Sequence, residues 1–410
     1  MINSMVLKLS EVNNLRANKF LILFKKAKSL FLICLAVPCV ILARLLRPLV
    51  LIRFGFLFSS RIGHFAIETE LYLCELEKGL RSKKYFDLFY LIHPVCNVQL
   101  LKMFARRREL HINDFALWLD RVNRVIPGGL EHVVKSPIER DLHNLLMQTQ
   151  THLSFTEQEQ GLGIAESKKL GVPENCNFVC FYTRDPAYLN KIMPENNWKY
   201  HNYRDSDIKN CLPAIKKLTQ KGYFALRMGA VVKEPLDTTD PQIIDYASRA
   251  RSDFMDIYLS SRCRFFITSA AGLAAVPMAF RVPLVWINFI PLEHVPSWSP
   301  NDLFIPKKLW LKNEKRLMTF GEILHSPVSR SLYTHDFEKL GIEILENTAE
   351  EISAVVMEME ERLCGNWQAS LEDEELQKRF WALFKGSNLH GKIMSRMGRD
   401  FLRENQELLG

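Results

Sequence analysis

The sequence lacks the short motifs that most often reveal a nucleotide-dependent or hydrolytic enzyme. No G-x-G-x-x-G follows its first predicted strand and no G-x-x-x-x-G-K-[ST] occurs in it, which removes the usual support for a dinucleotide-binding or P-loop protein. It also has no G-x-S-x-G elbow and no H-E-x-x-H zinc helix. Any ligand must therefore be inferred from where residues fall in the fold.

The cysteines do not predict a metal site. There are nine, and only Cys176 and Cys180 stand close to a pair spacing, with no second pair beside them. Zinc sites usually show paired Cys or Cys/His ligands, so buried free thiols in a reducing cytosol are the favoured interpretation. The net charge of +8 is moderate and no basic run with interleaved aromatics is present, so we predict no nucleic-acid partner.

One long hydrophobic run lies near the N-terminus, from Leu30 to Ala43. It is shorter than the roughly 20 apolar residues of a spanning helix, contains Pro38 and ends at Arg44. No small-residue cleavage site follows, which argues against a secretory signal. Lysines 25, 26 and 28 precede the run, so we predict a segment that associates with the cytoplasmic leaflet without crossing it. The alternative is a hydrophobic helix packed on the first domain.

From Leu51 onward, strand-like and helix-like stretches alternate, which predicts an α/β fold with parallel sheets and crossover helices. At 410 residues the chain is too long for one ordinary core. We expect two Rossmann-like domains facing across a cleft, with a helical C-terminal tail that returns to the first domain. The predicted bounds are 1–48 for the membrane-associating segment, 49–165 and 166–368 for the two domains, and 369–410 for the tail.

Residues directly after predicted strands form the candidate site, because parallel sheets bind ligands at the carboxyl ends of their strands. Arginine offers forked, permanently charged donors that suit phosphate, and a helix beginning at Gly272 adds backbone N–H groups. The combination predicts a phosphate or diphosphate ligand. The candidate contacts are Gly63, Arg184, Arg227, Gly229, Ser269, Ala270, Ala271, Gly272 and Asn288.

Each candidate also has a structural interpretation. For Arg227 the structural interpretation, a cap on a sheet edge that pairs with Asp245 or Asp253, carries the same weight as a role in the site. The small residues 269–272 can serve close packing of a helix on a sheet, and a lone histidine such as His64 is more often part of the protein framework than of a site.

Four blocks of the sequence resemble a family of bacterial surface-polysaccharide glycosyltransferases, in the order expected, over roughly residues 50–365. The blocks are LIRFGFLFSSRIGHFAIETELYLCE, HNYRDSDIKNCLPAIKKLTQKGYFALRMG, IIDYASRARSDFMDIYLSSRCRFFITSAAGLAAVPMAFRVPLVWIN and TAEEISAVVMEMEERLCG.

This resemblance implies a GT-B-like architecture, with residues 49–165 facing an acceptor and residues 166–368 holding a nucleotide sugar as co-substrate. It implies no cofactor and no metal. Arg184, Arg227 and the loop 269–272 would contact the donor diphosphate, and Gly63 and His64 would face it from the first domain. The sequence shows no clear Glu-x(7)-Glu donor signature of the commonest retaining families, so inversion and retention both stay open.

The implied activity is transfer of a sugar to a glycan or lipid-linked acceptor at the inner face of the cytoplasmic membrane. His64 is the candidate general base, with Asp185 and Asp205 as rivals, because an inverting transferase must remove the acceptor proton. The alternatives are a nucleotide-sugar epimerase on the same fold and a non-catalytic partner in a polysaccharide assembly complex.

Overall fold

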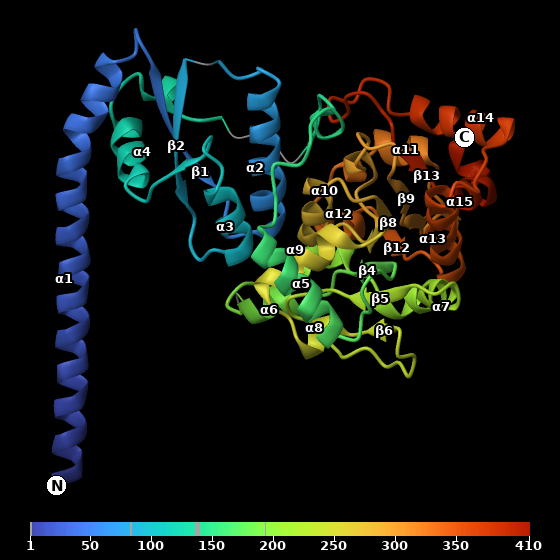
Figure 1. The fold of residues 1–410 in the computed structure, drawn as a ribbon, viewed down its shortest axis with the longest axis horizontal. Coiled ribbons are helices and arrows are strands. Elements are labelled where there is room, and N and C mark those ends of the chain that lie inside the picture. The colour runs from blue at the N-terminus through green and yellow to red at the C-terminus, as the bar shows by residue number, and fades with distance from the viewer. Residues whose placement is uncertain (1, 83, 136–139, 193) are drawn as a thin grey trace. The chain divides into compact units, whose positions relative to one another are not determined.

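The computed structural model describes residues 2–82, 84–135, 140–192 and 194–410. The chain divides into two compact units (Figure 1). The smaller comprises Met1–Ser60, Gly79–Pro94 and Arg107–Ser136, and the larger comprises Arg61–Lys78, Val95–Arg106 and Pro137–Gly410. The segments with helices α2 (Ile62–Glu77) and α3 (Val98–Ala105) therefore group with the larger unit. The division at residues 48, 165 and 368 stays a prediction.

The smaller unit is built on a parallel sheet of β1 (Leu51–Leu57), β2 (Tyr85–Leu91) and β3 (His111–Ile112), in that order. Helix α4 (Ala116–Val125) and the C-terminal turns of α1 (Ile2–Leu45) pack on it, and Figure 1 shows α4 beside the upper part of the long blue α1. The sequence of residues 111–126 predicts one continuous helix, and the structure differs at its start. His111 and Ile112 pair with β2 as a third strand, and helix begins only at Ala116.

The larger unit holds a parallel seven-stranded sheet, which confirms the predicted α/β class. Its order is β13 (Arg396–Met397), β9 (Leu303–Pro306), β8 (Leu284–Phe289), β7 (Phe266–Thr268), β4 (Phe178–Tyr182), β5 (Phe224–Arg227) and β6 (Ile243–Ile244). Every neighbouring pair runs parallel, so all carboxyl ends meet at one edge.

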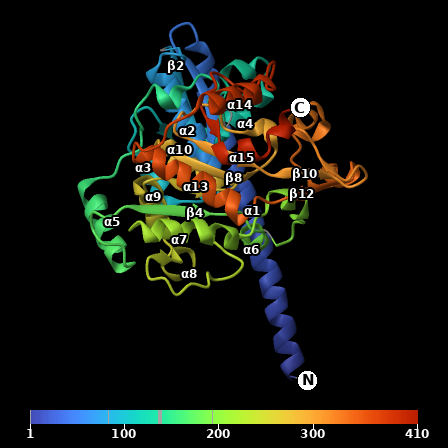
Figure 2. The same cartoon turned by 90° about the vertical axis from the view of Figure 1, so that its right-hand side faces the viewer.

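Both faces of this sheet are covered, which is why its central strands are mainly apolar. Along β4, Val179 and Phe181 point into one core, and Cys180 points into the other. Helices α7 (Leu212–Gln220) and α13 (Ala349–Leu363) supply the first core, and α9 (Asp253–Arg262) supplies the second. Figure 2 shows β4 between α7 and α9. Side chains alternate along a strand, so burial on both sides needs an unbroken apolar run.

The remaining elements extend the larger unit. A small antiparallel sheet has the order β11 (Arg316–Leu317), β10 (Lys308–Leu311) and β12 (Ile342–Leu345). The other helices are α5 (Glu157–Lys169), α6 (Ala187–Ile192), α8 (Tyr246–Arg249), α10 (Ala275–Ala279), α11 (Phe320–His325), α12 (Thr334–Lys339), α14 (Leu371–Ala382) and α15 (Arg399–Glu404).

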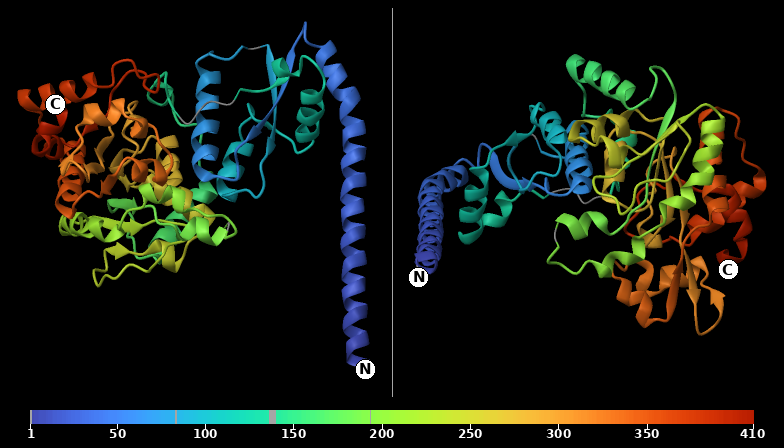
Figure 3. Two further views of the ribbon diagram at one scale, coloured as in Figure 1. Left: turned by 180° about the vertical axis from the view of Figure 1, so that it is seen from behind. Right: turned by 90° about the horizontal axis from the view of Figure 1, so that it is seen from below.

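The C-terminal tail contacts residues within the predicted first domain, 49–165, since Arg140 donates to the carbonyl of Leu389 at 2.7 Å and Asn144 to that of Lys392 at 2.9 Å. Most of its packing, however, is on the seven-stranded sheet. Its strand β13 pairs with β9, and α15 packs on α13, so the tail completes the larger unit (Figure 3, red segments). Buried Phe401 and Leu402 of α15 join the core of the seven-stranded sheet, which explains why these residues are apolar in a charged tail.

Local signals placed several helix ends correctly. Thr348 and Glu351 form the predicted capping box at the start of α13. Pro213 lies in the first turn of α7 rather than in a helix interior, because residues 208–211 form a separate 3-10 turn. Helix α2 begins at Ile62, so Gly63 and His64 lie in its first turn and not in a preceding loop.

Candidate functional site: a buried basic cluster at the sheet edge

The segments after β4, β7 and β9 meet at the carboxyl edge of the seven-stranded sheet. Arg184 follows β4, and its backbone N–H donates to Oγ of Ser269, which directly follows β7, at 2.9 Å. This bond ties together two segments that the sequence predicted at one site. Arg184 is 6% exposed and Ser269 is fully buried, so both belong to the interior of that edge.

The two terminal nitrogens of the Arg184 guanidinium differ in their hydrogen bonding. Its Nη1 donates to the carbonyl of His201 at 3.2 Å and pairs with the carboxylate of Asp205. Its Nη2 is buried and has no hydrogen-bond partner in the described part of the chain. Burial and the nearby charge of Arg204 lower the pKa of Arg184 to about 10. The arginine is held charged in surroundings that disfavour its charge.

Lys307 is a second buried cation beside it, in the residue between β9 and β10. Its Nζ donates to the carbonyl of Asp205 at 2.6 Å, and the residue is 5% exposed. Burial lowers the pKa of the amine to about 8; Glu346 opposes this shift and Arg184 adds to it. Sequence analysis missed Lys307. Its position directly after an apolar strand was the available signal, but that strand was not assigned.

The turn Lys199–Arg204, labelled η3 among the 3-10 helices, supplies the rest of the cluster. The Nε of Arg204, the Nδ1 of His201 and the hydroxyl of Tyr203 are all buried without a hydrogen-bond partner among the described residues. Burial, Arg204 and Arg184 lower the pKa of His201 to about 4, so this imidazole is neutral at pH 7. We call Arg184, His201, Arg204 and Lys307 the basic cluster.

Unpartnered buried donors are rare, because each costs roughly 1–3 kcal/mol. Among the described residues, Arg184, His201 and Arg204 each have one such buried nitrogen. Of the carboxylates in that part of the chain, Asp205 alone bonds to a cation of the cluster, through Arg184. A ligand with several acceptor oxygens and more than one negative charge is the chemistry that satisfies this arrangement. Phosphate and diphosphate groups fit that description.

The small-residue loop has a packing role as well. A Cβ on Gly63 would lie 2.9 Å from Cα of Gly272, so the start of α2 and the turn after β7 touch backbone to backbone. Glycine at position 63 is explained by this contact. Ala270 and Ala271 are half-buried and Gly272 is exposed at the same edge. Their contact with a ligand stays a prediction.

His64 forms a pair that suits proton transfer. Its Nδ1 lies 2.9 Å from Oε1 of Glu68, one helical turn further along α2, and both side chains are half-buried. A carboxylate that accepts from Nδ1 leaves Nε2 as the basic nitrogen of the ring. Sequence analysis missed Glu68, although the spacing of four residues on a helix would have revealed it.

The rival bases are occupied by local bonds. Both carboxylate oxygens of Asp185 accept backbone N–H groups, from Ala187 at 2.8 Å and from Lys233 at 3.1 Å. Asp205 pairs with Arg184. Because their oxygens already accept local bonds, His64 remains the first candidate for the base.

Three predicted contacts have evident structural roles, and their contact with ligand stays a prediction. The Nη1 of Arg227 donates to the carbonyl of Glu234 at 2.6 Å and pairs with Asp245 at 3.6 Å, the ion pair that was the alternative interpretation. Gly229 has φ of +146°, a conformation that favours glycine. Asn288 lies inside β8 and exchanges two 2.6 Å bonds with Asn347.

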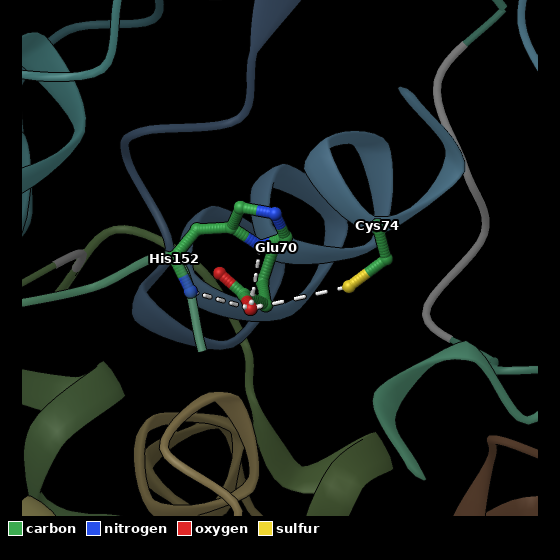
Figure 4. A group of neighbouring side chains, drawn as sticks. All are labelled: Glu70, Cys74 and His152. Atoms are coloured by element: carbon green, nitrogen blue, oxygen red, sulfur yellow. Dashed lines mark hydrogen bonds and ion pairs between the residues drawn. The ribbon is translucent and has the colours of Figure 1, made fainter. Parts of the chain in front are cut away.

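A second buried polar group joins two residues of α2 to His152 (Figure 4). Oε1 of the fully buried Glu70 accepts from His152 Nδ1 at 3.0 Å and from Arg281 Nη2 at 2.8 Å, with Cys74 Sγ at 3.9 Å. Glu70, Cys74 and His152 resemble a metal-ligand set. Arg281, however, already supplies a cation to the same oxygen, so we interpret the group as a structural charge network.

Burial alone would lower the pKa of His152, but its interactions with Cys74 and Glu70 raise it to about 9. The imidazolium therefore adds a second positive charge beside Glu70 at pH 7. Because Arg281 also donates to the carbonyl of Leu146 at 2.6 Å, the network joins α2 to the segment before α5 and to the end of α10.

A surface depression of about 450 Å³ lies elsewhere, between α7, α13 and α15. Its charged lining residues are mainly acidic, including Glu350, Glu361 and Asp400. An acidic lining repels phosphate, so we do not place the anion there.

No family model matches the chain, and no curated protein matches it. Among solved structures, it is similar to a family 9 glycosyl transferase from Veillonella parvula, at 14% identity and a TM-score of 0.38 over 58% of this chain and 80% of that one. It is also similar to the ADP-heptose LPS heptosyltransferase II of E. coli, at 15% identity and a TM-score of 0.37 over 70% and 98% of the two chains. A third similar structure is the dodecameric iron-containing heptosyltransferase TibC in complex with ADP-D-beta-D-heptose, at 12% identity and a TM-score of 0.37 over 77% and 76%. These neighbours are glycosyltransferases, but at such overlap the function of this chain must be argued from its own residues.

Proposed function

We propose that the protein is a glycosyltransferase that moves a sugar from a nucleotide-sugar donor to a glycan or lipid-linked acceptor in surface-polysaccharide biosynthesis. The observation that carries the proposal is the basic cluster at the ligand-binding edge of a parallel sheet, in which Arg184, His201 and Arg204 have buried side-chain nitrogens without a hydrogen-bond partner among the described residues.

The basic cluster would hold the donor diphosphate and stabilise it as it leaves. Breaking the bond between sugar and diphosphate leaves negative charge on the leaving oxygen. Fixed cations in a water-poor site stabilise that charge more strongly than water does. Arg184 would offer Nη2 and Arg204 its Nε, while Lys307 would add a compact charge. Residues of the chain would thus supply the charge that other transferases take from a metal ion, and we propose a metal-independent reaction.

His64 would act as the general base in an inverting reaction, oriented by Glu68. It would accept the acceptor hydroxyl proton on Nε2 while Glu68 holds the proton on Nδ1. Two contacts connect the basic cluster to the segment that carries His64. Gly63, adjacent to His64, touches Gly272, and Ser269 of the same loop accepts from Arg184.

The N-terminal helix supports the proposed lipid-linked acceptor and membrane location. An enzyme acting on a lipid-linked acceptor works at a membrane, and α1 includes an apolar 22-residue stretch, Phe24–Leu45. We propose that the protein works at the cytoplasmic face of the membrane.

Nucleotide binding tests the proposal. Nucleoside diphosphates and nucleotide sugars are added to the full chain, and thermal stability is measured with and without Lys307→Met. A ligand of the folded state raises stability by about 2.7 kcal/mol at about 100 times its dissociation constant. We expect a shift with one nucleotide class and a smaller shift in the variant.

The matched control is Lys308→Met, which removes the same charge one residue away, where the amine pairs with Glu351 at 2.6 Å. Each variant is compared with its own ligand-free state. Equal ligand shifts in both variants, or no shift with any nucleotide, would contradict a diphosphate site at the basic cluster.

Incubation with the stabilising nucleotide sugar then separates the alternatives. A transferase consumes the donor at an appreciable rate only when acceptor is present and releases a nucleoside diphosphate. An epimerase converts the donor without acceptor and releases no diphosphate, and a non-catalytic partner does neither.

A further inference from the structure

The C-terminal half of α1 exposes an extensive apolar surface. The segment Phe24–Leu45 has a mean hydropathy of 2.1, and by length and composition alone it could cross a membrane. Only 17% of its most apolar window is buried within the protein. The exposed large apolar side chains of this segment are Phe24, Leu30, Phe31, Ile33, Leu35, Val37, Ile41, Leu42 and Leu45.

One narrow stripe of the same helix is packed against the smaller unit. Ala36, Val40 and Ala43 are buried in a core with Leu119 and Val122 of α4. The spacing of four and three residues places all three on one side of the helix.

Arg44 fixes the end of this stripe. Its guanidinium donates to the carbonyls of Pro127 at 2.7 Å, Asn123 at 3.0 Å and Ile126 at 3.1 Å, and also to the side chain of Asn123. The last turns of α1 are therefore an integral part of the smaller unit.

This packing is incompatible with a membrane-spanning helix. Ala36 lies near the middle of Phe24–Leu45, so a spanning helix would carry its neighbour α4 into the hydrocarbon. Helix α4 bears Asp120, Arg121 and Arg124, and charged side chains are strongly disfavoured there. The part of the segment before Ala36 is too short to span, at 12 residues or roughly 18 Å against roughly 30 Å of hydrocarbon.

Three more large apolar side chains of the smaller unit are exposed close to the end of α1. Leu49 is 78% exposed, Val125 84% and Leu130 80%. They flank the junction where Arg47 pairs with Glu131 at 2.6 Å. We call the exposed apolar side chains of Phe24–Leu45 together with these three the docking surface.

The charged side chains in and around Phe24–Leu45 have one sign, whereas Glu131 lies beside Leu130 and pairs with Arg47. From residue 12 to residue 67 the chain contains no Asp or Glu and nine Lys or Arg. Lys25, Lys26 and Lys28 are exposed at the start of the apolar segment. Apolar side chains bordered by lysines match an anionic lipid surface, where the chains enter the interface and the amines meet the headgroups.

We propose that α1 lies in the plane of an anionic membrane and binds it through the docking surface without crossing it. The N-terminus and the body of the smaller unit then stay on the same side of the bilayer. This inference does not depend on the proposed sugar chemistry.

The test uses the full chain with a protease-cleavable tag at its N-terminus, added from outside to sealed vesicles. Flotation measures binding to vesicles of phosphatidylcholine alone and with one third phosphatidylserine, and external protease reports on which side the tag lies. We expect binding that increases with the anionic lipid and a tag that is fully cleaved. A protected tag would mean that the helix crosses the membrane and would overturn the proposal, as would absence of binding to either vesicle.

Variants test whether vesicle binding depends on the docking surface or on nonspecific adsorption of apolar side chains. Leu42→Asp and Leu130→Asp should each weaken vesicle binding about tenfold or more. Each replaces an apolar side chain that would be buried in the lipid with a charged one. The matched control is Leu371→Asp, because Leu371 is 92% exposed but lies on α14 in the larger unit. Replacing Lys25, Lys26 and Lys28 with glutamine should weaken binding to anionic vesicles about fivefold per lysine. Binding to vesicles of phosphatidylcholine alone should not change.

The same samples also test whether a second copy of the chain occupies the docking surface. Sedimentation without lipid measures the oligomeric state of the wild type and of Leu42→Asp. A stable dimer that Leu42→Asp dissociates, combined with no vesicle binding, would assign the surface to a second copy of the chain and overturn the proposal.

Discussion

Lys307 gives the sharpest quantitative prediction, because a buried amine without a directly bonded carboxylate should destabilise the protein until an anion binds. Its pKa falls from the ordinary 10.5 to about 8 in the folded state, a shift of about 2.5 units. At about 1.36 kcal/mol per unit, the charged amine costs about 3 kcal/mol of folding free energy at pH 7.

The substitution Lys307→Met removes that cost and keeps a side chain of similar length. It also removes the hydrogen bond to the carbonyl of Asp205, a loss of about 1 kcal/mol. The variant should therefore be more stable than the wild type by about 2 kcal/mol at pH 7, measured as the free energy of unfolding of the larger unit in urea.

The pH dependence tests the cause. The folded pKa lies below the unfolded one, so the cost is complete below about pH 8 and disappears as the pH rises to 10.5. The gain from Lys307→Met should shrink over that window. A variant that is less stable than the wild type at pH 7, or a gain that does not change with pH, would refute the reasoning.

Three further predictions concern the rest of the larger unit. His152→Gln should lower the free energy of unfolding most at low pH, by up to about 3 kcal/mol. The pKa of His152 is raised from 6.5 to about 9, so the stability it contributes is complete below pH 6.5 and is lost as the pH rises through 9. Urea titrations at pH 6 to 9.5 measure this, and a difference that grows with pH would contradict it. Gly63→Ala should destabilise the protein by about 1–3 kcal/mol, since its Cβ would meet the backbone of Gly272 at 2.9 Å, whereas Gly161→Ala, with open space around it, should not. If sugar transfer is demonstrated, Glu68→Gln should lower kcat at least tenfold with little change in KM and shift the pH profile, and an unchanged profile would remove Glu68 from the role of orienting His64.

Sequence patterns predicted the elements whose signals are local. The strand 177–185, the capping box of α13 and the glycine stop at Gly222 were all recognisable, because apolar runs, caps and left-handed glycines depend on neighbouring residues. Short elements were less accessible. The two-residue strand β3 exists only because β2 offers hydrogen-bond partners, and nothing in the residues His111 and Ile112 distinguishes them from the helix that follows.

The candidate site divides in the same way. Arg184 and Ser269 were found by the rule that ligands bind beyond strand ends, and the structure bonds one to the other. Arg204, His201 and Lys307 were not found. The first two lie in a 3-10 turn with no periodicity, and the third lies where one strand passes into another sheet.

Composition and pattern alone determined that this chain forms parallel α/β sheets and carries an apolar, basic N-terminal helix. Both are properties of residues close together in the chain. Only the tertiary structure decided which charges are buried together and which face of α1 is covered. Arg184 and Lys307 are 123 residues apart, and the strands β1, β2 and β3 separate Val40 from α4 along the chain. Burial and charge proximity are set by the packing of distant segments, and so are the lowered pKa of Lys307 and the exposed docking surface.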